Sequence, residues 1–267
     1  MKRVFTVMGQ DARQQAAERT LRRRGCRVQS ETAAGADCLL LPFAAAEPQQ
    51  LAAAKPGGLV FGGSFSPNVI RCAGNRGLRL VDCLADPGFA ERNAVPTAEG
   101  ALLLLLQNRT RTLRQSPVLV LGFGRVGRVL TDRLLALGAR VTVAARSAGQ
   151  CAQAEGMGAD SIPLCRMGEL LPFYETAVNT IPAPVLGQEQ LRLLPQGSFI
   201  LDLASAPGGT DFAAARQLGL RALHAPGLPG RFFPDTAGTL YAETVLEWLN
   251  QPEKPENSCT PENFLLK

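Results

Sequence analysis

The stretch that decides the fold is VLVLGFGRVG, residues 118–127. A short apolar run ends in Gly122, Gly124 and Gly127, and a helical pattern then leads to a second apolar run, Arg140–Ala145. Strand, glycine turn, helix and strand form the context in which a GxGxxG run binds a dinucleotide. The first glycine permits the tight turn, the second lets the backbone approach the pyrophosphate, and the third lets the helix pack on the strand. We therefore expect a dinucleotide site; the alternative is a glycine turn that serves packing alone.

The residues around this turn also indicate which dinucleotide is bound. At the start of the helix, the N–H groups of Arg125 and Val126 are expected to face the phosphates. At the end of the second strand, an NAD site normally has Asp or Glu to hold the ribose 2′-hydroxyl, whereas this chain has Arg146 and Ser147. A guanidinium can bind a 2′-phosphate through its planar fork, and the serine can donate a further hydrogen bond. NADP is therefore expected rather than NAD, unless Arg146 is only a solvated residue.

Composition excludes several other classes of protein. The chain has 267 residues, 46% of them hydrophobic, and a formal net charge of +5, which suits one large or two modest α/β domains. Its densest basic cluster, in residues 22–27, has no interleaved aromatic residues, so no nucleic-acid partner is expected. Seven cysteines form no CxxC and there is one histidine, so no metal site is expected. The odd cysteine count without a signal peptide, and the lack of a long apolar run, predict a cytoplasmic protein with no membrane association.

Strand and helix patterns alternate along the whole chain. The sequence predicts a small parallel-sheet domain over residues 1–92, with strands at Arg3–Met8, Cys26–Gln29, Cys38–Leu41, Leu59–Phe61 and Leu78–Leu80. A Rossmann domain is predicted over residues 93–235, with further strands at Thr176–Asn179, Ser198–Leu203 and Leu220–Leu223. The expected fold class is thus α/β, with two doubly wound parallel-sheet domains and a ligand-binding cleft between them.

Three further segments connect or extend these domains. A helix over 97–114 is predicted to cross between them, with Thr97 as a cap and Glu99 in its first turn. A helix over 236–249 is expected to return to the first domain. The Pro- and Glu-rich residues 251–267 are expected to be a flexible tail.

Substrate-binding residues are expected where strands of the first domain end. Asp11 can cap the helix after the first strand, and Arg13 lies in that helix's first turn, where a cation opposes the helix dipole. A cation in such a place indicates anion recognition, for example of a substrate carboxylate. Ser64, in a glycine turn after a later strand, and Thr97 can donate hydrogen bonds to the same substrate. A purely local role in a cap or turn is the alternative for each.

Two strand ends of the second domain carry polar loops. The residues expected beside the nicotinamide ribose are Asn179, Thr180, Ile181 and Pro182. The next loop offers Asp202, Ser205, Gly208, Gly209 and Asp211 for the substrate or the nicotinamide. One general base is expected among Asp202, Asp211 and Glu99, and the residues alone do not choose between them. Asp211 and Glu99 could instead serve the starts of their helices, and the single histidine, His224, is expected at the rim or in the core.

The order of these motifs resembles the family of dipicolinate synthase A subunits from spore-forming bacteria. The matching stretches are GQDARQ (9–14), NAVPTAEGA (93–101), VLGFGRVG (120–127), ARS (145–147), VNTIPAPVL (178–186), ILDLASAPGGTDF (200–212), APGLPG (225–230) and PDTAG (234–238). The last three are far more specific than the GxGxxG run.

The resemblance implies a two-domain fold like that of D-2-hydroxyacid dehydrogenases and a sporulation function in the mother-cell cytoplasm. It implies NADP-dependent oxidation of a dihydro- or hydroxytetrahydrodipicolinate, a small dicarboxylate from the lysine pathway, to dipicolinate. It also implies work with the flavoprotein-like B subunit of dipicolinate synthase, and leaves homo-oligomerisation open. Aromatising the ring removes a hydride and a proton, so one base suffices.

Two other functions compete with this one. A D-2-hydroxyacid dehydrogenase needs an Arg after a late Rossmann strand and then an acid and a His, but residues 204–209 read ASAPGG and residues 226–230 read PGLPG. A non-catalytic protein that binds NADP and scaffolds a flavoprotein is the other alternative.

Overall fold

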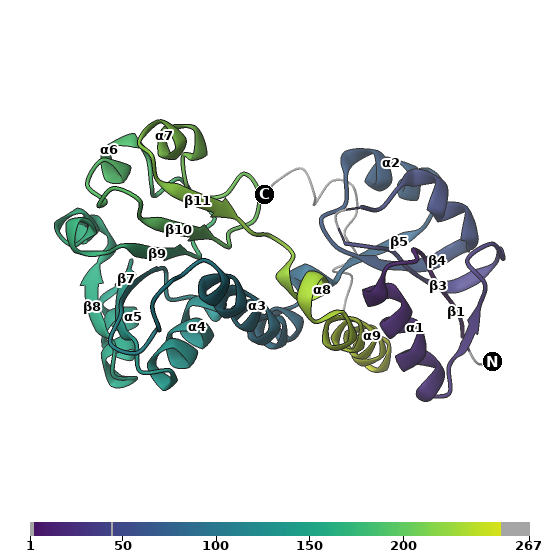
Figure 1. The fold of residues 1–267 in the computed structure, drawn as a ribbon. Coiled ribbons are helices and arrows are strands. Elements are labelled where there is room, and N and C mark those ends of the chain that lie inside the picture. The colour runs from purple at the N-terminus through teal and green to yellow at the C-terminus, as the bar shows by residue number, and fades with distance from the viewer. Residues whose placement is uncertain (1–2, 44, 252–267) are drawn as a thin grey trace. The chain divides into compact units, whose positions relative to one another are not determined.

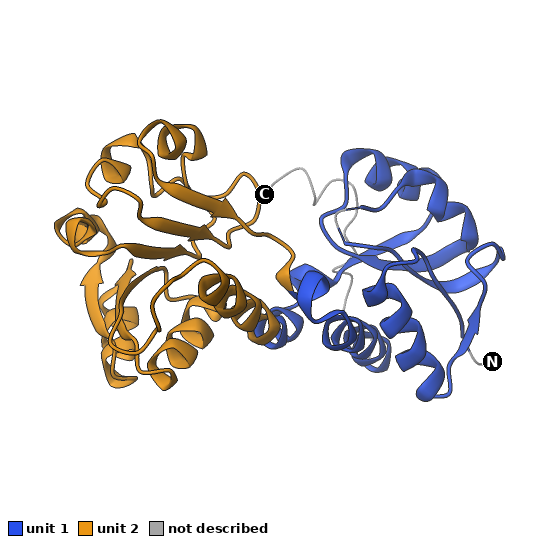
Figure 2. Cartoon of the chain, in the orientation of Figure 1, with its two compact units in different colours: residues 1–93, 229–267 blue, residues 94–228 orange. Residues whose placement is uncertain are grey.

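The computed structural model describes residues 3–43 and 45–251, which divide into two compact units (Figure 2). Unit 1 holds the described residues up to Asn93 and those from Pro229 on, and unit 2 holds Ala94–Leu228. Each unit has one parallel sheet with helices on both of its faces, so the predicted α/β fold of two doubly wound sheets is confirmed. The expected tail lies outside the described residues except for Gln251.

The sheet of unit 1 has the strand order β2-β1-β3-β4-β5, one of the two common doubly wound orders (Figure 1). Its strands are β1 (Val4–Val7), β2 (Arg27–Gln29), β3 (Ala36–Leu40), β4 (Ala54–Gly62) and β5 (Arg79–Asp82). Its helices are α1 (Ala12–Arg23), α2 (Pro67–Asn75), the start of α3 (Pro87–Gln107), most of α8 (Leu228–Phe232) and α9 (Pro234–Asn250).

Neighbouring side chains of each central strand in unit 1 enter two different apolar clusters. Cys38 and Leu40 pack with Leu21 of α1 and Val245 of α9, whereas Leu39 of the same strand packs under α2. Because successive side chains of a strand point to opposite faces, this alternation buries both faces of the sheet.

The sheet of unit 2 has the order β11-β10-β9-β6-β7-β8, and every pairing is parallel. Counted from β6, this is the 3-2-1-4-5-6 order of the dinucleotide-binding fold. The strands are β6 (Pro117–Leu121), β7 (Arg140–Ala145), β8 (Asp160–Pro163), β9 (Thr176–Asn179), β10 (Phe199–Asp202) and β11 (Arg221–His224). The helices are α4 (Arg125–Ala136), α5 (Ala148–Gly156), α6 (Gln188–Leu191) and α7 (Phe212–Gln217), beside the end of α3.

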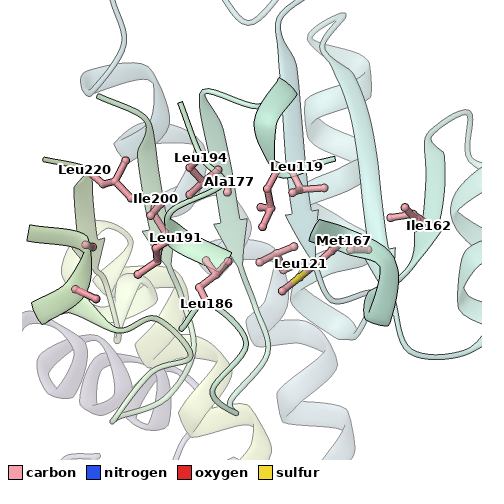
Figure 3. Packing of buried hydrophobic residues seen from close by; sticks show 14 residues of the cluster. Leu119, Leu121, Ile162, Met167, Ala177, Leu186, Leu191, Leu194, Ile200 and Leu220 are labelled. Carbon is pink, nitrogen blue, oxygen red and sulfur yellow. The ribbon is translucent and has the colours of Figure 1, made fainter. Parts of the chain in front are cut away.

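One face of this sheet carries a continuous apolar cluster, shown in Figure 3. Leu119, Leu121 and Ile200 contribute from the strands, and Leu191 packs on them from α6. The cluster holds β6, β9 and β10 together, and the ends of these three strands carry predicted cofactor, substrate and catalytic residues.

The helix predicted over 97–114 was wrong in its bounds, because α3 begins at Pro87 and ends at Gln107. Asp86 caps it, since its Oδ1 accepts from the Phe89 N–H at 2.7 Å. Pro96 therefore lies inside the helix, where it removes one backbone donor without ending it. Thr97 is consequently an interior residue rather than the predicted cap, and Glu99 is exposed in the middle of the helix.

Two kinds of feature are absent from the residues that the structure describes. None of their helices is long and apolar enough to cross a membrane. Nor do three or more of their His, Cys, Asp or Glu side chains gather where they could bind a metal ion.

Helices α1 and α9 approach each other very closely at Gly238. A Cβ on this residue would overlap the carbonyl oxygen of Arg13 and lie 2.6 Å from the Cβ of Ala16. Gly238 therefore sets the distance at which α9 covers α1.

Gly238→Ala is expected to lower the free energy of unfolding of unit 1 by about 2–3 kcal/mol, because the added methyl forces the two helices apart. The chain has one tryptophan, Trp248, which packs on Phe61 at 5.4 Å between ring centroids, so its fluorescence in urea reports on this unit. Thr236→Ala, at an exposed position of α9, is the control and should change stability by less than about 0.5 kcal/mol. Equal unfolding midpoints for the two variants would contradict this account.

Candidate functional site

The strand order of unit 2 reverses between β6 and β9, where dinucleotides bind in folds of this type. The two strand ends are joined by Thr180, whose backbone N–H and side-chain hydroxyl both donate to the Leu121 carbonyl at 2.9 Å. Thr180 thus links the ends of β6 and β9 next to the glycine turn.

Packing within the protein accounts for two of the three glycines in this turn. Gly122 has φ +96°, and a Cβ there would lie 2.5 Å from Thr180 Oγ1. A Cβ on Gly127 would overlap the Gly122 carbonyl oxygen. Gly124 differs, because no described atom lies within 4 Å of the place its Cβ would take. Packing within the protein therefore does not require a glycine at this exposed position.

The start of α4 faces this open space with its backbone donors. No side chain of the described residues caps the helix, whose N-cap is Gly124. The N–H groups of a first turn have no partner within the helix and attract anions. Arg125 is exposed there and Val126 is half-buried. These features fit the pyrophosphate of a dinucleotide.

The end of β7 carries a cation and a helix cap instead of an acid. Ser147 caps α5 by accepting from the Gln150 N–H at 3.2 Å, which leaves its hydroxyl proton available to an acceptor. Arg146 is exposed and makes no hydrogen bond or ion pair with any described residue. A phosphate on the adenosine ribose would find two donors here.

Asn179 and Asp202, predicted at the ends of β9 and β10, lie in the interior of unit 2. Asp202 has no exposed surface, and its Oδ1 accepts from Asn179 Nδ2 and the Ala204 N–H, both at 3.0 Å. Its Oδ2 accepts from the Gly209 N–H at 2.8 Å. Asn179 Oδ1 also accepts from the Ile181 N–H at 3.0 Å. Both side chains therefore hold the loops in shape.

The glycines predicted to bind substrate are also explained by packing. A Cβ on Gly209 would lie 2.6 Å from the Ala183 carbonyl oxygen, and Gly208 has φ +88° beside Asp202. Ser205 in the same loop is exposed, as is Pro182, whereas Ile181 is half-buried. His224 Nε2 lies 2.9 Å from the Ala204 carbonyl oxygen, and the ring has no charged hydrogen-bond partner among the described residues.

Asp211 caps α7, where its Oδ1 accepts from the Ala214 N–H at 2.9 Å, and it stays exposed. The structure thus separates the three predicted base candidates, because Asp211 and Glu99 are exposed while Asp202 is fully buried.

In unit 1, the Arg13 guanidinium lies beside an aromatic ring and a glycine. It stands over the Phe43 ring at 5.2 Å, and a Cβ on Gly230 would lie 2.6 Å from its Nε. Burial lowers the pKa of the Arg13 guanidinium, and the nearby Asp11 carboxylate acts in the opposite direction. The guanidinium makes no hydrogen bond or ion pair with the described residues. It is therefore a half-buried cation without a hydrogen-bond partner among these residues.

Asp11 and Ser64 lie at other strand ends of the same unit. Asp11 caps α1 by accepting from the Arg13 and Gln14 N–H groups at 2.9 and 3.1 Å. Ser64 is exposed with φ +53°, a conformation that a residue other than glycine rarely takes and that occurs often at functional sites.

Comparison with known proteins identifies the family. The dipicolinate synthase A subunit of Bacillus subtilis (strain 168) is 36% identical over 198 residues, 74% of this chain and 67% of that protein. The chain belongs to the family of dipicolinate synthase A subunits. No protein-family profile matches the chain.

Solved structures agree with this family. The crystal structure of the dipicolinate synthase A subunit from Bacillus halodurans has a TM-score of 0.87 and 28% identity, covering 94% of this chain and 99% of that chain. The apo-structure of D-lactate dehydrogenase from Escherichia coli has a TM-score of 0.68 and 14% identity, covering 94% and 96%. The second likeness concerns the fold alone.

Sequence reasoning missed two residues that surround Arg13. Phe43 stacks on the guanidinium and also contacts Tyr241, at 4.6 Å between ring centroids. Gly230 leaves room for the guanidinium, and the APGLPG motif of the family was the available signal for it.

The two aspartates of the 202–211 loop should respond differently to loss of charge. Asp202→Asn is expected to lower the free energy of unfolding by about 2–3 kcal/mol, because an amide group would face hydrogen-bond donors. Asp211→Asn should change it by less than about 0.5 kcal/mol, because Asn caps helices as well as Asp. Urea unfolding followed by circular dichroism measures both, and equal stability of the two variants would contradict the buried network.

Proposed function

We propose that this chain is an NADP-dependent oxidoreductase that converts a dihydro- or hydroxytetrahydrodipicolinate to dipicolinate, as the A subunit of a dipicolinate synthase. The assignment of a dinucleotide cofactor rests on the open space beside Gly124. Packing explains the other two glycines of this turn but not Gly124. The family to which the chain belongs supports the reaction.

Unit 2 would hold the cofactor along the ends of β6, β7 and β9. The first-turn N–H groups of α4 bind the pyrophosphate, and Arg146 and Ser147 bind the 2′-phosphate. Thr180, Ile181 and Pro182 line the nicotinamide half. When bound, the nicotinamide supplies a hydride acceptor.

Unit 1 would contribute the recognition of the dicarboxylate. Arg13 can bind one carboxylate with two parallel hydrogen bonds, because no described side chain occupies its donors. Asp11, Ser64 and, from unit 2, Thr97 and Ser205 are proposed as further contacts of the substrate.

The dihydro substrate loses a hydride to the nicotinamide and a proton, which needs one base; the hydroxytetrahydro substrate must lose one water molecule in addition. Asp211 and Glu99 are the proposed candidates, since both carboxylates are exposed. Asp202 would instead position the 202–211 loop, because its oxygens are taken by three donors.

The proposal includes a partner and a setting. The flavoprotein-like B subunit of the synthase would work with this chain during sporulation, in the mother-cell cytoplasm.

The test is dipicolinate absorbance after mixing NADP and fresh hydroxytetrahydrodipicolinate with this chain, alone and together with that flavoprotein. Product that depends on NADP supports the proposal, and no product in either mixture contradicts it. Product that forms without NADP would leave only a scaffolding function.

Arg146→Asp is expected to weaken NADP binding roughly 100-fold while NAD binding changes little, because a carboxylate repels the 2′-phosphate and accepts from a ribose hydroxyl. Equilibrium titration with both cofactors measures the ratio. Arg140→Asp, at the opposite end of β7, is the matched control and should leave the preference unchanged. A preference that survives in Arg146→Asp would remove this residue from the cofactor site.

Arg13→Leu is expected to raise the KM for the dicarboxylate about 10- to 100-fold, since a charge-assisted hydrogen-bond pair is lost. Its unfolding free energy should stay equal or rise, because the half-buried guanidinium forms no ion pair with the described residues. Arg27→Leu, at an exposed position of unit 1, controls for the loss of a positive charge. An unchanged KM, or a large loss of stability, would show that Arg13 is structural.

A further inference from the structure

A second group of cations lies at the edge of the unit 2 sheet opposite to the glycine turn. Here the strands β9, β10 and β11 begin, and a hollow of about 330 Å³ opens between the residues that precede them and the segment after α3. Arg109, Arg111 and Arg221 line this hollow, together with one carboxylate, Glu175. No step of the proposed reaction uses these residues.

Arg109 is fixed in place by neutral groups. Its Nη1 donates to Thr176 Oγ1 at 2.8 Å, and its Nε donates to the Arg111 carbonyl oxygen at 3.4 Å. Burial lowers the pKa of the Arg109 guanidinium, and Glu175 acts in the opposite direction. The Arg109 side chain is half-buried, so its guanidinium is restricted to this position and cannot pair with a carboxylate elsewhere on the surface.

Arg221 is held in a similar way. Its Nη2 donates to Asn108 Oδ1 at 3.1 Å and to the Asn108 carbonyl at 3.3 Å, and its guanidinium stands over the Phe199 ring at 5.3 Å. An aromatic face and an amide orient the group while leaving its charge uncompensated.

Several arginines elsewhere in the chain form ion pairs with carboxylates. Arg22 pairs with Glu18 and Arg24 with Glu243, both at 2.7 Å. In contrast, none of Arg109, Arg111 and Arg221 forms an ion pair with a carboxylate in the described part of the chain. Three cations and one acid around a hollow leave an excess of positive charge that attracts anions.

We propose that this hollow binds a small polyanion, a phosphate or a di- or tricarboxylate, through the guanidinium groups of Arg109, Arg111 and Arg221. Guanidinium groups bind both kinds of oxyanion with paired hydrogen bonds. The volume of about 330 Å³ lies in the lower range of small-ligand sites. The site is separate from the NADP site, because it lies at the other ends of the strands.

The experiment is isothermal titration of the full chain with inorganic pyrophosphate and, separately, with citrate. An Arg13→Leu, Arg146→Gln background and saturating NADPH keep the probes out of the proposed substrate and cofactor sites. We expect one binding event whose affinity falls about tenfold or more in Arg111→Gln and in Arg221→Gln. Arg111 is exposed, so its substitution should not disturb the packing of the residues around the hollow.

Two further variants make the outcome decisive. Glu175→Gln should tighten binding of the anion, because it removes the one carboxylate of the lining. Arg216→Gln, at an exposed position of α7 away from the hollow, should leave the affinity unchanged. An equal loss in Arg216→Gln and Arg111→Gln, or no binding of either probe, would overturn the proposal. Failure of the Arg146→Asp titration would overturn only the cofactor assignment.

Discussion

The cofactor end of unit 2 depends on the close approach of α4 to the end of β6. Gly127 has no room for a side chain beside the Gly122 carbonyl, and Gly122 has none beside Thr180. This contact draws the first turn of the helix against the sheet, so its backbone donors face the gap between β6 and β9. Gly124 itself is exposed, with no described atom within 4 Å of the place its Cβ would take, so an anion can approach the backbone there.

A buried polar network gives the next loops their shape. Asp202 accepts hydrogen bonds from Asn179, Ala204 and Gly209, which come from the ends of two strands and from a loop. A fully satisfied network of this kind makes a single loop conformation far more stable than others. Residues that looked catalytic in the sequence therefore hold the loop, and exposed neighbours such as Asp211 remain available for chemistry.

The sequence was sufficient where local patterns agreed with each other. Glycine spacing, strand runs and helix periodicity in residues 118–145 all predict the same unit, and the structure has it. The start of α3 was predicted incorrectly because proline is common at the first position of a helix, which favoured a start at Pro96. In the structure the helix begins after Asp86, whose side chain caps it. The burial of Asp202 could not be predicted, since it depends on donors that chain folding brings together. The position of the Arg13 guanidinium could not be predicted either, because it depends on the space left by Gly230, which is distant in the sequence.

The central claim is that the space beside Gly124 receives the pyrophosphate of NADP. The direct measurement is the dissociation constant of NADPH for the wild-type chain and for Gly124→Val, with adenosine 2′-monophosphate as a probe that lacks a pyrophosphate. The account predicts at least about 100-fold weaker NADPH binding, nearly unchanged binding of the monophosphate and unfolding within about 1 kcal/mol of wild type. Unchanged NADPH affinity in Gly124→Val would contradict it.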